Sequence, residues 1–433
     1  MVWSREETIA REELNQLQLN RLQDTVMKIY NNVPFYRKRL DEMGVKPEDI
    51  QSLEDVTKLP FTTKDDFRDN YPYGLFAVPM DDVVRLHASS GTTGKSTVVG
   101  YTQKDLNTWT EVVARIIKQA GVTNRDIVQV AFGYGLFTGA FGLHYGLEKV
   151  GATVVPTSSG GTEKQIMIMK DFGTTVLVST PSYALHMAEV AEKMGLIGDL
   201  KLRVGLFGAE GCSDEMRKEI EKRWGIIATD NYGLSEVIGP GVSGECEYKQ
   251  GMHISEDHFL VEVIDPHTLQ SVKPGQKGEL VFTTLTKEAL PVIRYRTKDI
   301  SYIMQEPCHC GRTTARMAKV SGRSDDMLII RGVNVFPSQI ESVLMEIDGI
   351  APHYQLVVSK KNHMDQLEVK VEVTAAALTR GHLEIQRIER TVTKRLQSVL
   401  SIKAVISIME PFTMERFQGK AKRVIDMRQK AAI

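Results

Sequence analysis

A run of nine residues from Ser89 to Thr97 combines hydroxyl side chains and glycines around one lysine, Lys95. Glycines let backbone N–H groups face a ligand, hydroxyls donate further hydrogen bonds and lysine adds a positive charge, so the run predicts a phosphate-binding loop. It does not match a Walker A loop, because Ser89 stands where that motif has its first glycine and because Thr97–Thr102 is rich in β-branched residues. We expect a hairpin-like loop between strands; a polar turn without a ligand is the alternative.

Two further glycine-centred segments, Phe207–Gly211 and Asp230–Glu236, are each expected to follow the end of a strand. Ligands of open α/β sheets bind beyond the carboxyl ends of the strands, so these segments and the phosphate loop predict one nucleotide pocket. Tyr232 offers an aromatic face to a base, and the Glu236 carboxylate suits Mg²⁺ bridging to phosphate. A solvated loop carboxylate is the alternative for Glu236. Asp299, at another predicted strand end, can accept hydrogen bonds from both ribose hydroxyls.

A stretch without Lys, Arg, Asp or Glu, Ile127–Leu147, carries several aromatic residues. Its five glycines, with Gln129 and His144, favour a buried strand, a glycine-rich loop and a helix over a membrane span. The residues that predict a small apolar slot for an aromatic ring are Tyr134, Phe137, Phe141, Ile238, Gly239 and Pro240. Ordinary core packing is the alternative for each aromatic residue.

Three of the four cysteines stand in polar segments, whereas buried thiols that act as small hydrophobic groups occur in apolar ones. Three cysteines and one histidine complete a closed tetrahedral zinc site, which would join two loops. The predicted zinc ligands are Cys246, His253, Cys308 and Cys310. His258 and His309 are the alternative histidine ligands, and Cys212 is expected to have no role.

Apolar runs and helical patterns alternate between about residues 80 and 240, which predicts an α/β sheet packed between helices. Strands at Phe259–Ile264 and Gly278–Thr283 predict a smaller β subdomain. Near the C-terminus, apolar residues alternate strictly from Leu367 to Val373 and then recur at helical spacing from Ile385 to Val399. The last hundred or so residues therefore predict a small α+β domain.

The chain has 433 residues, enough for two or three domains, and its 54 Lys and Arg residues balance 55 Asp and Glu residues. This balance disfavours nucleic acid or a membrane as a partner and favours small molecules. The segment Met1–Gly44 lacks the apolar core of a secretion signal, and the cysteines do not resemble a disulfide framework. A cytoplasmic protein is expected.

The order of these motifs along the chain is more specific than any one of them. The run SSGTTGKST is followed by NYGLSE, YRTKD, the segment Gly322–Pro337 and then Gln418-Gly419-Lys420. Over nearly its whole length the chain resembles the adenylate-forming superfamily of acyl-CoA synthetases, and most of all phenylacetate–CoA ligases and related aryl-acid ligases. The resemblance implies an α/β fold, with an N-terminal ATP- and acyl-binding domain of several subdomains at 1–322 and a small, mobile α+β C-terminal domain at 323–433.

The resemblance also implies roles for individual residues. The phosphate loop closes over the β- and γ-phosphates, Glu210, Gly211 and residues 230–232 line the adenine, Ser235 touches the α-phosphate, and Asp299 binds ribose. The residues expected to bind the nucleotide are Ser89, Ser90, Gly91, Thr92, Thr93, Gly94, Lys95, Ala209, Glu210, Gly211, Asp230, Asn231, Tyr232, Gly233, Ser235, Asp299 and Arg323.

Catalysis is assigned by the resemblance to Glu236, which holds Mg²⁺, and to Lys420, whose charge meets the reacting phosphate. A solvated lysine in the basic tail is the alternative for Lys420. Asp325 matches the hinge of the mobile domain, and Arg331 and Gly332 match the path of the pantetheine arm of CoA.

The implied reaction has two halves. The carboxylate of the acid attacks the α-phosphate of ATP and releases pyrophosphate; the CoA thiol then displaces AMP and leaves a thioester. The first half needs no general base, because a carboxylate is already ionised at neutral pH. We therefore expect an acid–thiol ligase acting on phenylacetate, with ATP, CoA, Mg²⁺ and a structural Zn²⁺, and by resemblance a homodimer.

Other readings stay open at this point. Hydroxyphenylacetate, indoleacetate or benzoate would need a slot that differs by only one or two side chains. An ADP-forming phosphotransferase is an alternative enzyme, and a nucleotide-binding regulator without turnover is a non-enzymatic alternative.

Overall fold

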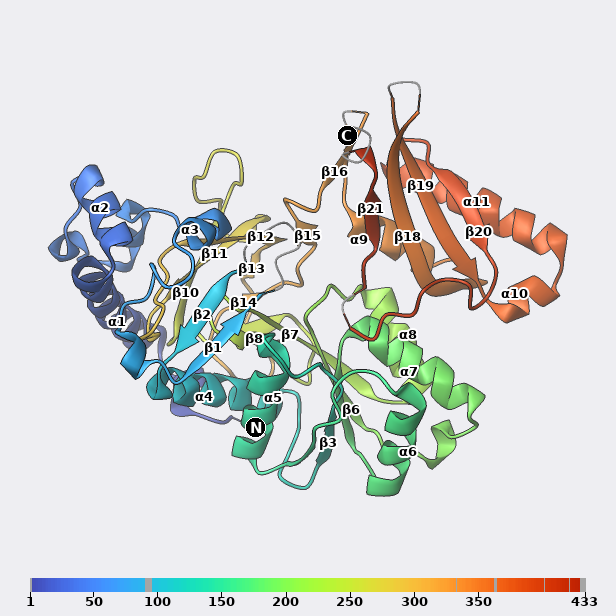
Figure 1. The fold of residues 1–433 in the computed structure, drawn as a ribbon, viewed down its shortest axis with the longest axis horizontal. Helices are drawn as coiled ribbons and strands as arrows, with labels where there is room; N and C mark the ends of the chain where they lie inside the picture. Colours follow the sequence, from blue (N-terminus) through green and yellow to red (C-terminus); the bar gives the residue numbers. More distant parts are fainter. Residues whose placement is uncertain are drawn as a thin grey trace. The chain divides into compact units, whose positions relative to one another are not determined.

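The computed structural model describes residues 2–89, 96–331, 333–361, 364–400, 402–419 and 421–428. The chain divides into two compact units, whose elements are labelled in Figure 1. The first unit consists of Met1–Ser179, Asp199–Ala209 and Ile227–Val320. The second unit consists of Thr180–Gly198, Glu210–Ile226 and Ser321–Ile433. The domain boundary expected after residue 322 stays a prediction.

A nine-stranded sheet forms the centre of the first unit, in the order β13-β14-β9-β8-β7-β6-β5-β3-β4. Its strands are β3 (Ile127–Val130), β4 (Thr153–Val155), β5 (Val176–Ser179), β6 (Val204–Phe207), β7 (Ile227–Leu234), β8 (Gly239–Glu245), β9 (Met252–Ile254), β13 (Ile303–Met304) and β14 (Arg316–Met317). The strands from β4 to β7 run parallel, and those from β7 to β13 pair antiparallel. Strands β5 and β6 are buried at every position, as expected for inner parallel strands.

The remaining strands of the first unit form two smaller antiparallel arrangements. One is the hairpin of β1 (Arg85–Ala88) and β2 (Val98–Tyr101); the other joins β10 (Phe259–Ile264), β11 (Gly278–Thr284) and β12 (Tyr295–Ser301). The helices are α1 (Arg11–Asn32), α2 (Pro34–Met43), α3 (Lys64–Asp69), α4 (Gln103–Gln119), α5 (Thr138–Val150) and α6 (Thr162–Phe172). Helices α4 and α5 pack against each other and against β8.

The second unit carries a four-stranded sheet in the order β20-β19-β18-β21. The strands of this sheet are β18 (Ile350–Lys361), β19 (Met364–Val373), β20 (Val405–Met409) and β21 (Val424–Asp426). The unit also contains β15 (Gly322–Arg323) and a two-stranded sheet of β16 (Leu328–Ile330) and β17 (Val333–Val335). Its helices are α7 (Pro181–Lys193), α8 (Asp214–Trp224), α9 (Pro337–Met345), α10 (Ala375–Thr379) and α11 (His382–Leu400).

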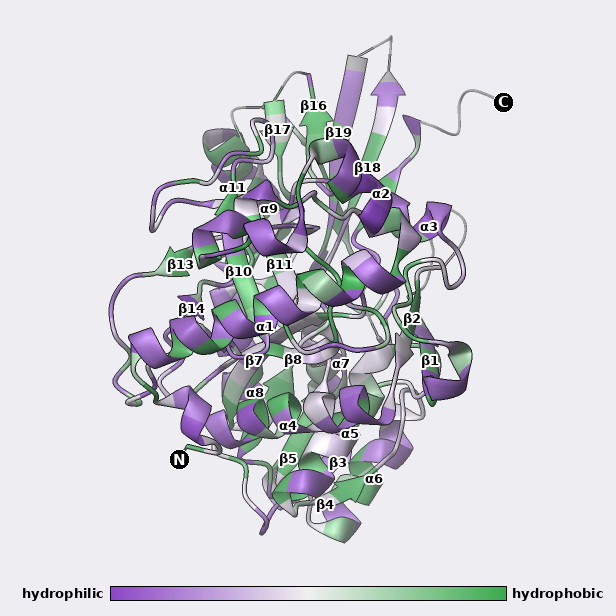
Figure 2. Cartoon of the chain, turned by 90° about the vertical axis from the view of Figure 1, so that its left-hand side faces the viewer, coloured by the Kyte–Doolittle hydropathy of each residue, from purple (hydrophilic) through white to green (hydrophobic). Residues whose placement is uncertain are grey.

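Each unit has its own apolar core, and the sequence patterns place it correctly. The alternating residues of β19, from Leu367 to Val373, are buried together with Ile388, Val392 and Leu396 of α11. Figure 2 shows green, hydrophobic residues along strands such as β5, and much purple along the visible face of α1. The predicted α/β sheet, β subdomain and C-terminal α+β fold are thereby confirmed.

Two local expectations were wrong. Asp230–Leu234 does not follow a strand but belongs to β7, and Asp299 lies inside β12 rather than at its end. The stretch Ile127–Leu147 is β3, a loop and the start of α5, as expected. Among the described residues, no helix is both long enough and apolar enough to cross a membrane.

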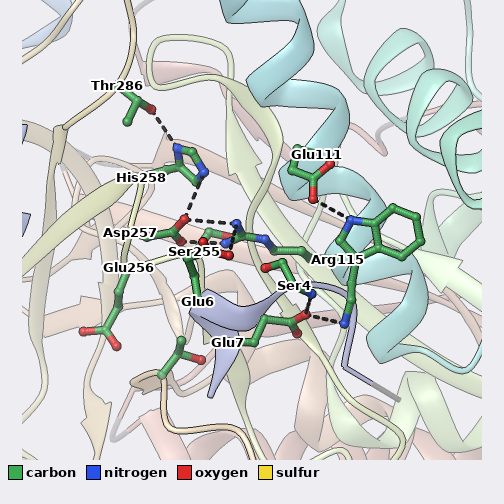
Figure 3. A network of polar contacts seen from close by, with 12 residues as sticks. Ser4, Glu6, Glu7, Glu111, Arg115, Ser255, Glu256, Asp257, His258 and Thr286 are labelled. Carbon is green, nitrogen blue, oxygen red and sulfur yellow. Dashed lines mark hydrogen bonds and ion pairs between the residues drawn. The ribbon is translucent and has the colours of Figure 1, made fainter. Parts of the chain in front are cut away.

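A buried ionic network ties α4 to the loops at the end of β9 and of β11 (Figure 3). Arg115 of α4 donates two hydrogen bonds to Asp257, at 2.6 and 3.0 Å, and both side chains are almost completely buried. Asp257 also lies 3.1 Å from Nε2 of His258, whose Nδ1 lies 2.8 Å from the Thr286 hydroxyl. Burial opposes ionisation of Asp257, but His258 and Arg115 outweigh it and hold the pKa of this carboxyl below its usual range.

Arg115→Met should destabilise the protein by about 3–5 kcal/mol, because it leaves the buried Asp257 charge without its bidentate partner. The midpoint of urea unfolding measures this. Lys170→Met is the matched control, since Lys170 pairs with Asp199 at 2.6 Å on the surface and should contribute at most about 1 kcal/mol. Equal shifts for the two variants would contradict a structural role for the buried pair.

Candidate functional site

The phosphate loop leaves the end of the β1–β2 hairpin, as the sequence predicts. The N–H of Ser89 donates to the carbonyl of Thr97 at 3.0 Å, which closes the neck of the loop. The hydroxyls of both residues are buried and have no hydrogen-bond partner in the described part of the chain, so they can donate to a ligand held by the loop. The expected contacts of Ser90, Gly91, Thr92, Thr93, Gly94 and Lys95 lie outside the described residues.

The motif NYGLSE forms the end of β7 and the turn into β8. The Tyr232 hydroxyl donates to Asp299 of β12 at 2.6 Å, which joins the expected adenine and ribose residues. Asn231 donates to the carbonyl of Phe207 at 2.6 Å. A Cβ atom on Gly233 would lie 1.8 Å from the carbonyl oxygen of Gly239, so this close approach requires glycine.

Asp230 and Ser235 are held at the two ends of this motif. The N–H of Asp230 donates to Glu245 at 2.9 Å. The hydroxyl of Ser235 lies 3.0 Å from that of Thr138, at the start of α5. These contacts attach the two ends of the motif to β8 and to α5 of the first unit.

Glu236 follows directly and is almost completely buried. Lys64, the first residue of α3, lies 4.0 Å from its carboxylate, and Glu236 has no hydrogen bond to any described residue. Its oxygens are therefore available to a hard cation such as Mg²⁺, which prefers carboxylate ligands. Sequence reasoning missed Lys64, because an isolated lysine at a helix start carries no motif.

Lys287 is a second lysine that the sequence did not single out. It stands in the loop between β11 and β12, is 4% exposed, and its Nζ lies 4.8 Å from the centre of the Tyr101 ring. In the described part of the chain its ammonium has no hydrogen-bond partner. Burial lowers the pKa of Lys287 from 10.5 to about 8, and the charges of Asp105 and Glu236 act in the opposite direction.

The residues of the expected acyl slot come together around α4 and α5. Trp109 of α4 donates to the carbonyl of Pro240 at 2.9 Å, and Tyr101 donates to that of Ile238 at 2.9 Å. A Cβ atom on Gly239 would lie 2.7 Å from the Trp109 ring. Trp109 and Tyr101 are thus neighbours of the slot that the sequence did not reveal.

The aromatic members of the slot differ in their surroundings. Phe141 packs edge-on against Tyr134, with ring centres 5.3 Å apart, and the Tyr134 hydroxyl lies 3.0 Å from Nδ1 of His144. Phe137, just before α5, is 43% exposed, and its ring lies 6.4 Å from that of Phe132. Phe137 is therefore a less enclosed member than Phe141.

Several predicted residues belong to the second unit. Glu210 accepts hydrogen bonds from the N–H groups of Ser182 at 2.7 Å and Ala421 at 3.0 Å. The hydroxyl of Thr180 donates to the carbonyl of Gly419 at 3.2 Å. Lys420 lies outside the described residues, but the residues on both sides of it are held. Ala209, which precedes Glu210 in the chain and belongs to the first unit, has a left-handed φ of 70°.

The expected hinge and CoA residues lie further along the second unit. Arg323 donates to Asp325 at 2.9 and 3.0 Å, so these two residues pair with each other. Arg331 is exposed, has a φ of 52°, and donates to the carbonyl of Asp365 at 2.9 Å. Gly332 lies outside the described residues, and Gly211 is exposed with open space beside it.

The four expected metal ligands form one cluster. Their ligand atoms all lie within 4.8 Å of one another: Cys246, His253, Cys308 and Cys310. The sulfurs of Cys246 and Cys308 are 3.6 Å apart, and that of Cys310 is 3.2 Å from Nε2 of His253. Two sulfurs each 2.3 Å from a tetrahedral metal would be about 3.8 Å apart, so the cluster fits zinc.

Neighbouring residues orient this cluster. Nδ1 of His253 lies 3.2 Å from the Thr314 hydroxyl, which directs Nε2 towards the sulfurs. Arg312 is hydrogen-bonded to Cys310 and also forms an ion pair with the buried Glu7 near the N-terminus. His258 contacts Asp257 and Thr286, and the ring of His309 lies 6.0 Å from that of Tyr248 at a tilted angle. Neither alternative histidine belongs to the cluster.

Comparison with known families agrees with this arrangement. The model of the AMP-binding enzymes matches residues 14–285, and that of the AMP-binding enzyme C-terminal domain matches residues 332–428. The chain therefore belongs to the AMP-binding, adenylate-forming enzymes.

Within this family the chain is similar to several phenylacetate–coenzyme A ligases over almost its full length. The chain is 52% identical to the phenylacetate–coenzyme A ligase of Aromatoleum evansii, covering 98% of this chain and 97% of that protein. It is 50% identical to the phenylacetate–coenzyme A ligase of Escherichia coli strain K12, with the same coverage. A solved 2-hydroxyisobutyryl-CoA ligase in the postadenylation state, with 2-HIB-AMP, is 28% identical with a TM-score of 0.93, covering 98% of this chain and 92% of that one.

The buried charge of Lys287 should make stability depend on pH. Between pH 8 and 10.5 the folded chain loses a proton that the unfolded chain keeps, so the free energy of unfolding rises with pH in this window. Lys287→Met removes this dependence. The variant should be more stable than the wild type at pH 7, and its advantage should shrink by about 2–3 kcal/mol by pH 10.

Urea unfolding at both pH values measures this difference. Lys104→Met is the control, because Lys104 is exposed and pairs with Glu288 in the same loop at 2.9 Å. Its difference from the wild type should stay nearly constant. If the difference in unfolding free energy between Lys287→Met and the wild type were also the same at both pH values, burial would not disfavour the charged form of Lys287.

Proposed function

We propose that this protein is an ATP-dependent, AMP-forming ligase that joins CoA to an aryl acid, with phenylacetate as the substrate. The observation that carries the proposal is the identity of about half of all residues with phenylacetate–coenzyme A ligases over 98% of the chain. The contacts of the first unit support it, because the expected adenine, ribose, α-phosphate and Mg²⁺ residues occur on adjoining strands and turns.

Several described residues would bind and orient the nucleotide. Tyr232 and Asp299, bonded to each other, present a ring and a carboxylate to adenosine, and Ser235 beside Thr138 presents a hydroxyl to the α-phosphate. Glu236 would hold Mg²⁺, which neutralises charge on the phosphates. Catalysis of the first half-reaction then consists of placing the acid carboxylate in line with the α-phosphate.

The slot around Phe141 and Ile238–Pro240 would hold the aryl ring of the acid. Its neighbours Tyr101 and Trp109 stack with ring centres 5.0 Å apart and fix the backbone of Ile238 and Pro240 by hydrogen bonds. A wall held in this way is rigid, which suits discrimination by ring size.

The second unit would supply Lys420 to the reacting phosphate. The residues on either side of Lys420 are hydrogen-bonded within this unit, Gly419 to Thr180 and Ala421 to Glu210. We also propose that the boundary between the two domains lies after residue 322 and that the C-terminal domain turns about Asp325. After this movement Arg331 and Gly332 would contact the pantetheine arm of CoA. The homodimer and the cytoplasmic location stay predictions.

The wild-type protein, given ATP, Mg²⁺, CoA and phenylacetate, should release AMP and pyrophosphate and form phenylacetyl-CoA. In a panel with hydroxyphenylacetate, indoleacetate, benzoate and short aliphatic acids, phenylacetate should have the highest kcat/KM. Chromatography of the nucleotide and thioester products measures these rates.

Glu236→Gln should lower kcat/KM for phenylacetate about a hundredfold or more in the same assay, because it removes the charge that would hold Mg²⁺.

Either of two results would reject the proposal. ADP in place of AMP would identify a phosphotransferase, and nucleotide binding without any turnover would identify a regulator. A different acid at the head of the panel would instead correct the substrate within the same reaction.

We further propose that Cys246, His253, Cys308 and Cys310 hold a structural zinc ion. The fit of the sulfur and nitrogen atoms to tetrahedral spacing supports this, as does the Thr314 contact that orients His253. The ion would tie the loop after β8 to the loop between β13 and β14 and, through Arg312 and Glu7, to the N-terminal segment.

Protein purified without a chelator should contain about one zinc ion per chain by elemental analysis, and Cys308→Ser should lose it and lower the midpoint of thermal unfolding. Cys212→Ser is the matched control, since Cys212 lies outside the cluster. Zinc-free protein with an unchanged unfolding midpoint would disprove the site.

A further inference from the structure

The loop that carries Lys287 is fixed on both sides of this residue. On one side, the N–H of Leu285 donates to the carbonyl of His258 at 2.9 Å, and Thr286 bonds the His258 ring at 2.8 Å (Figure 3). On the other side, the N–H groups of Glu288 and Ala289 donate to the Asp105 carboxylate at 2.6 and 2.9 Å. The backbone of Lys287 is therefore held in place before any ligand arrives.

The ammonium at the end of this side chain is unsatisfied. It offers three N–H donors, yet the described residues supply no acceptor, only the face of the Tyr101 ring at 4.8 Å. The Asp105 carboxylate lies near enough to act electrostatically, but backbone N–H groups occupy it. A buried charge without acceptors is unfavourable, so a rigid loop that keeps one there points to an acceptor that a ligand brings.

The position of the ammonium indicates the kind of ligand. Tyr101, whose ring faces the ammonium, is the last residue of β2, the strand that follows the phosphate loop, and its hydroxyl donates to the carbonyl of Ile238, two residues after Glu236. The two carboxylates whose charge reaches Lys287 are those of Asp105 and Glu236. Lys287 thus lies on the side of the site where Glu236 and the reacting groups would meet, and the acceptors brought there by the reactants are oxyanions.

We propose that Lys287 is a substrate-binding residue, whose ammonium donates hydrogen bonds to an oxyanion of the reactants beside Glu236. This rests on the proposed function, which brings two such oxyanions to the site: the triphosphate of ATP and the carboxylate of the aryl acid. Lys287 differs from Lys64, which pairs with Glu236 itself and is half exposed. The fixed loop makes Lys287 a preorganised donor, so little ordering accompanies binding.

The test compares equilibrium binding to the wild type, Lys287→Met, Lys287→Arg and the control Lys104→Met by calorimetry. The ligands are Mg–ATP, adenosine, and phenylacetate in the presence of α,β-methylene-ATP, so that no reaction occurs. Lys287→Met should bind Mg–ATP, phenylacetate or both about tenfold more weakly or worse, and adenosine unchanged. Lys287→Arg should recover part of the loss, and Lys104→Met should behave as the wild type.

The outcomes separate the sources and decide the proposal. A loss confined to Mg–ATP identifies the triphosphate as the partner, and a loss confined to phenylacetate identifies the carboxylate. Mg–ATP and phenylacetate binding within twofold of the wild type in a folded Lys287→Met variant overturns the proposal, as does an equal loss of adenosine binding. Thermal unfolding of each variant establishes that it is folded, and a wild type that binds these ligands but releases no AMP rejects only the proposed reaction.

Discussion

The carboxylate of Asp105 joins three parts of the first unit that are far apart in the chain. It accepts hydrogen bonds from the N–H groups of Thr102, Glu288 and Ala289, and the backbone N–H of Asp105 donates to the Thr102 hydroxyl. The end of β2, the start of α4 and the β11–β12 loop therefore meet at one buried residue. Each of these N–H groups would be costly to leave unpaired in the interior. The hairpin of the phosphate loop and the loop of Lys287 therefore have a fixed geometry relative to each other.

Helix α4 extends this arrangement along its length. Trp109 stands one turn after Asp105 and donates to the carbonyl of Pro240, which belongs to the proposed acyl slot. Arg115 stands further along and reaches, through Asp257 and His258, the same loop that Asp105 holds. One amphipathic helix with polar groups on its buried side thus holds the backbone of Pro240, in the wall of the proposed acyl slot, and contacts the Lys287 loop at two places. The buried ions on this face are stabilising only as complete networks, because a single unpaired charge in the interior is costly.

The sequence predicted those features that depend on local pattern. The alternation of apolar and polar residues predicted β19. The β-branched residues after a loop that does not have Walker A spacing predicted the β1–β2 hairpin. Cysteines in polar segments predicted the cluster of cysteines and a histidine. The motif around Gly233 was placed in a loop because glycines and polar residues usually mark one. In the fold, β7 and β8 approach so closely there that only glycine fits, and the segment is a strand.

What the sequence could not predict depends on contacts over long distances in the chain. The grouping of Thr180–Gly198 and Glu210–Ile226 with the C-terminal residues has no local signal. Lys64 and Lys287 are single lysines among many, and most lysines are exposed, so composition and spacing favour the solvated interpretation for both. Only the fold shows that one lies beside a buried carboxylate and that the other is enclosed.

The difference between Asp105 and Lys287 shows how the fold keeps a buried cation available. A carboxylate beside a lysine ordinarily forms a hydrogen-bonded pair with it, which satisfies both groups. Here three backbone N–H groups occupy the Asp105 oxygens, so Asp105 lowers the electrostatic cost of the Lys287 charge without accepting its hydrogen bonds. Folding alone would favour an apolar residue at this position, and residues that cost stability in a rigid setting are typical of functional sites. The Asp105 carboxylate therefore orders the β11–β12 loop and leaves the N–H donors of the Lys287 ammonium available to a ligand.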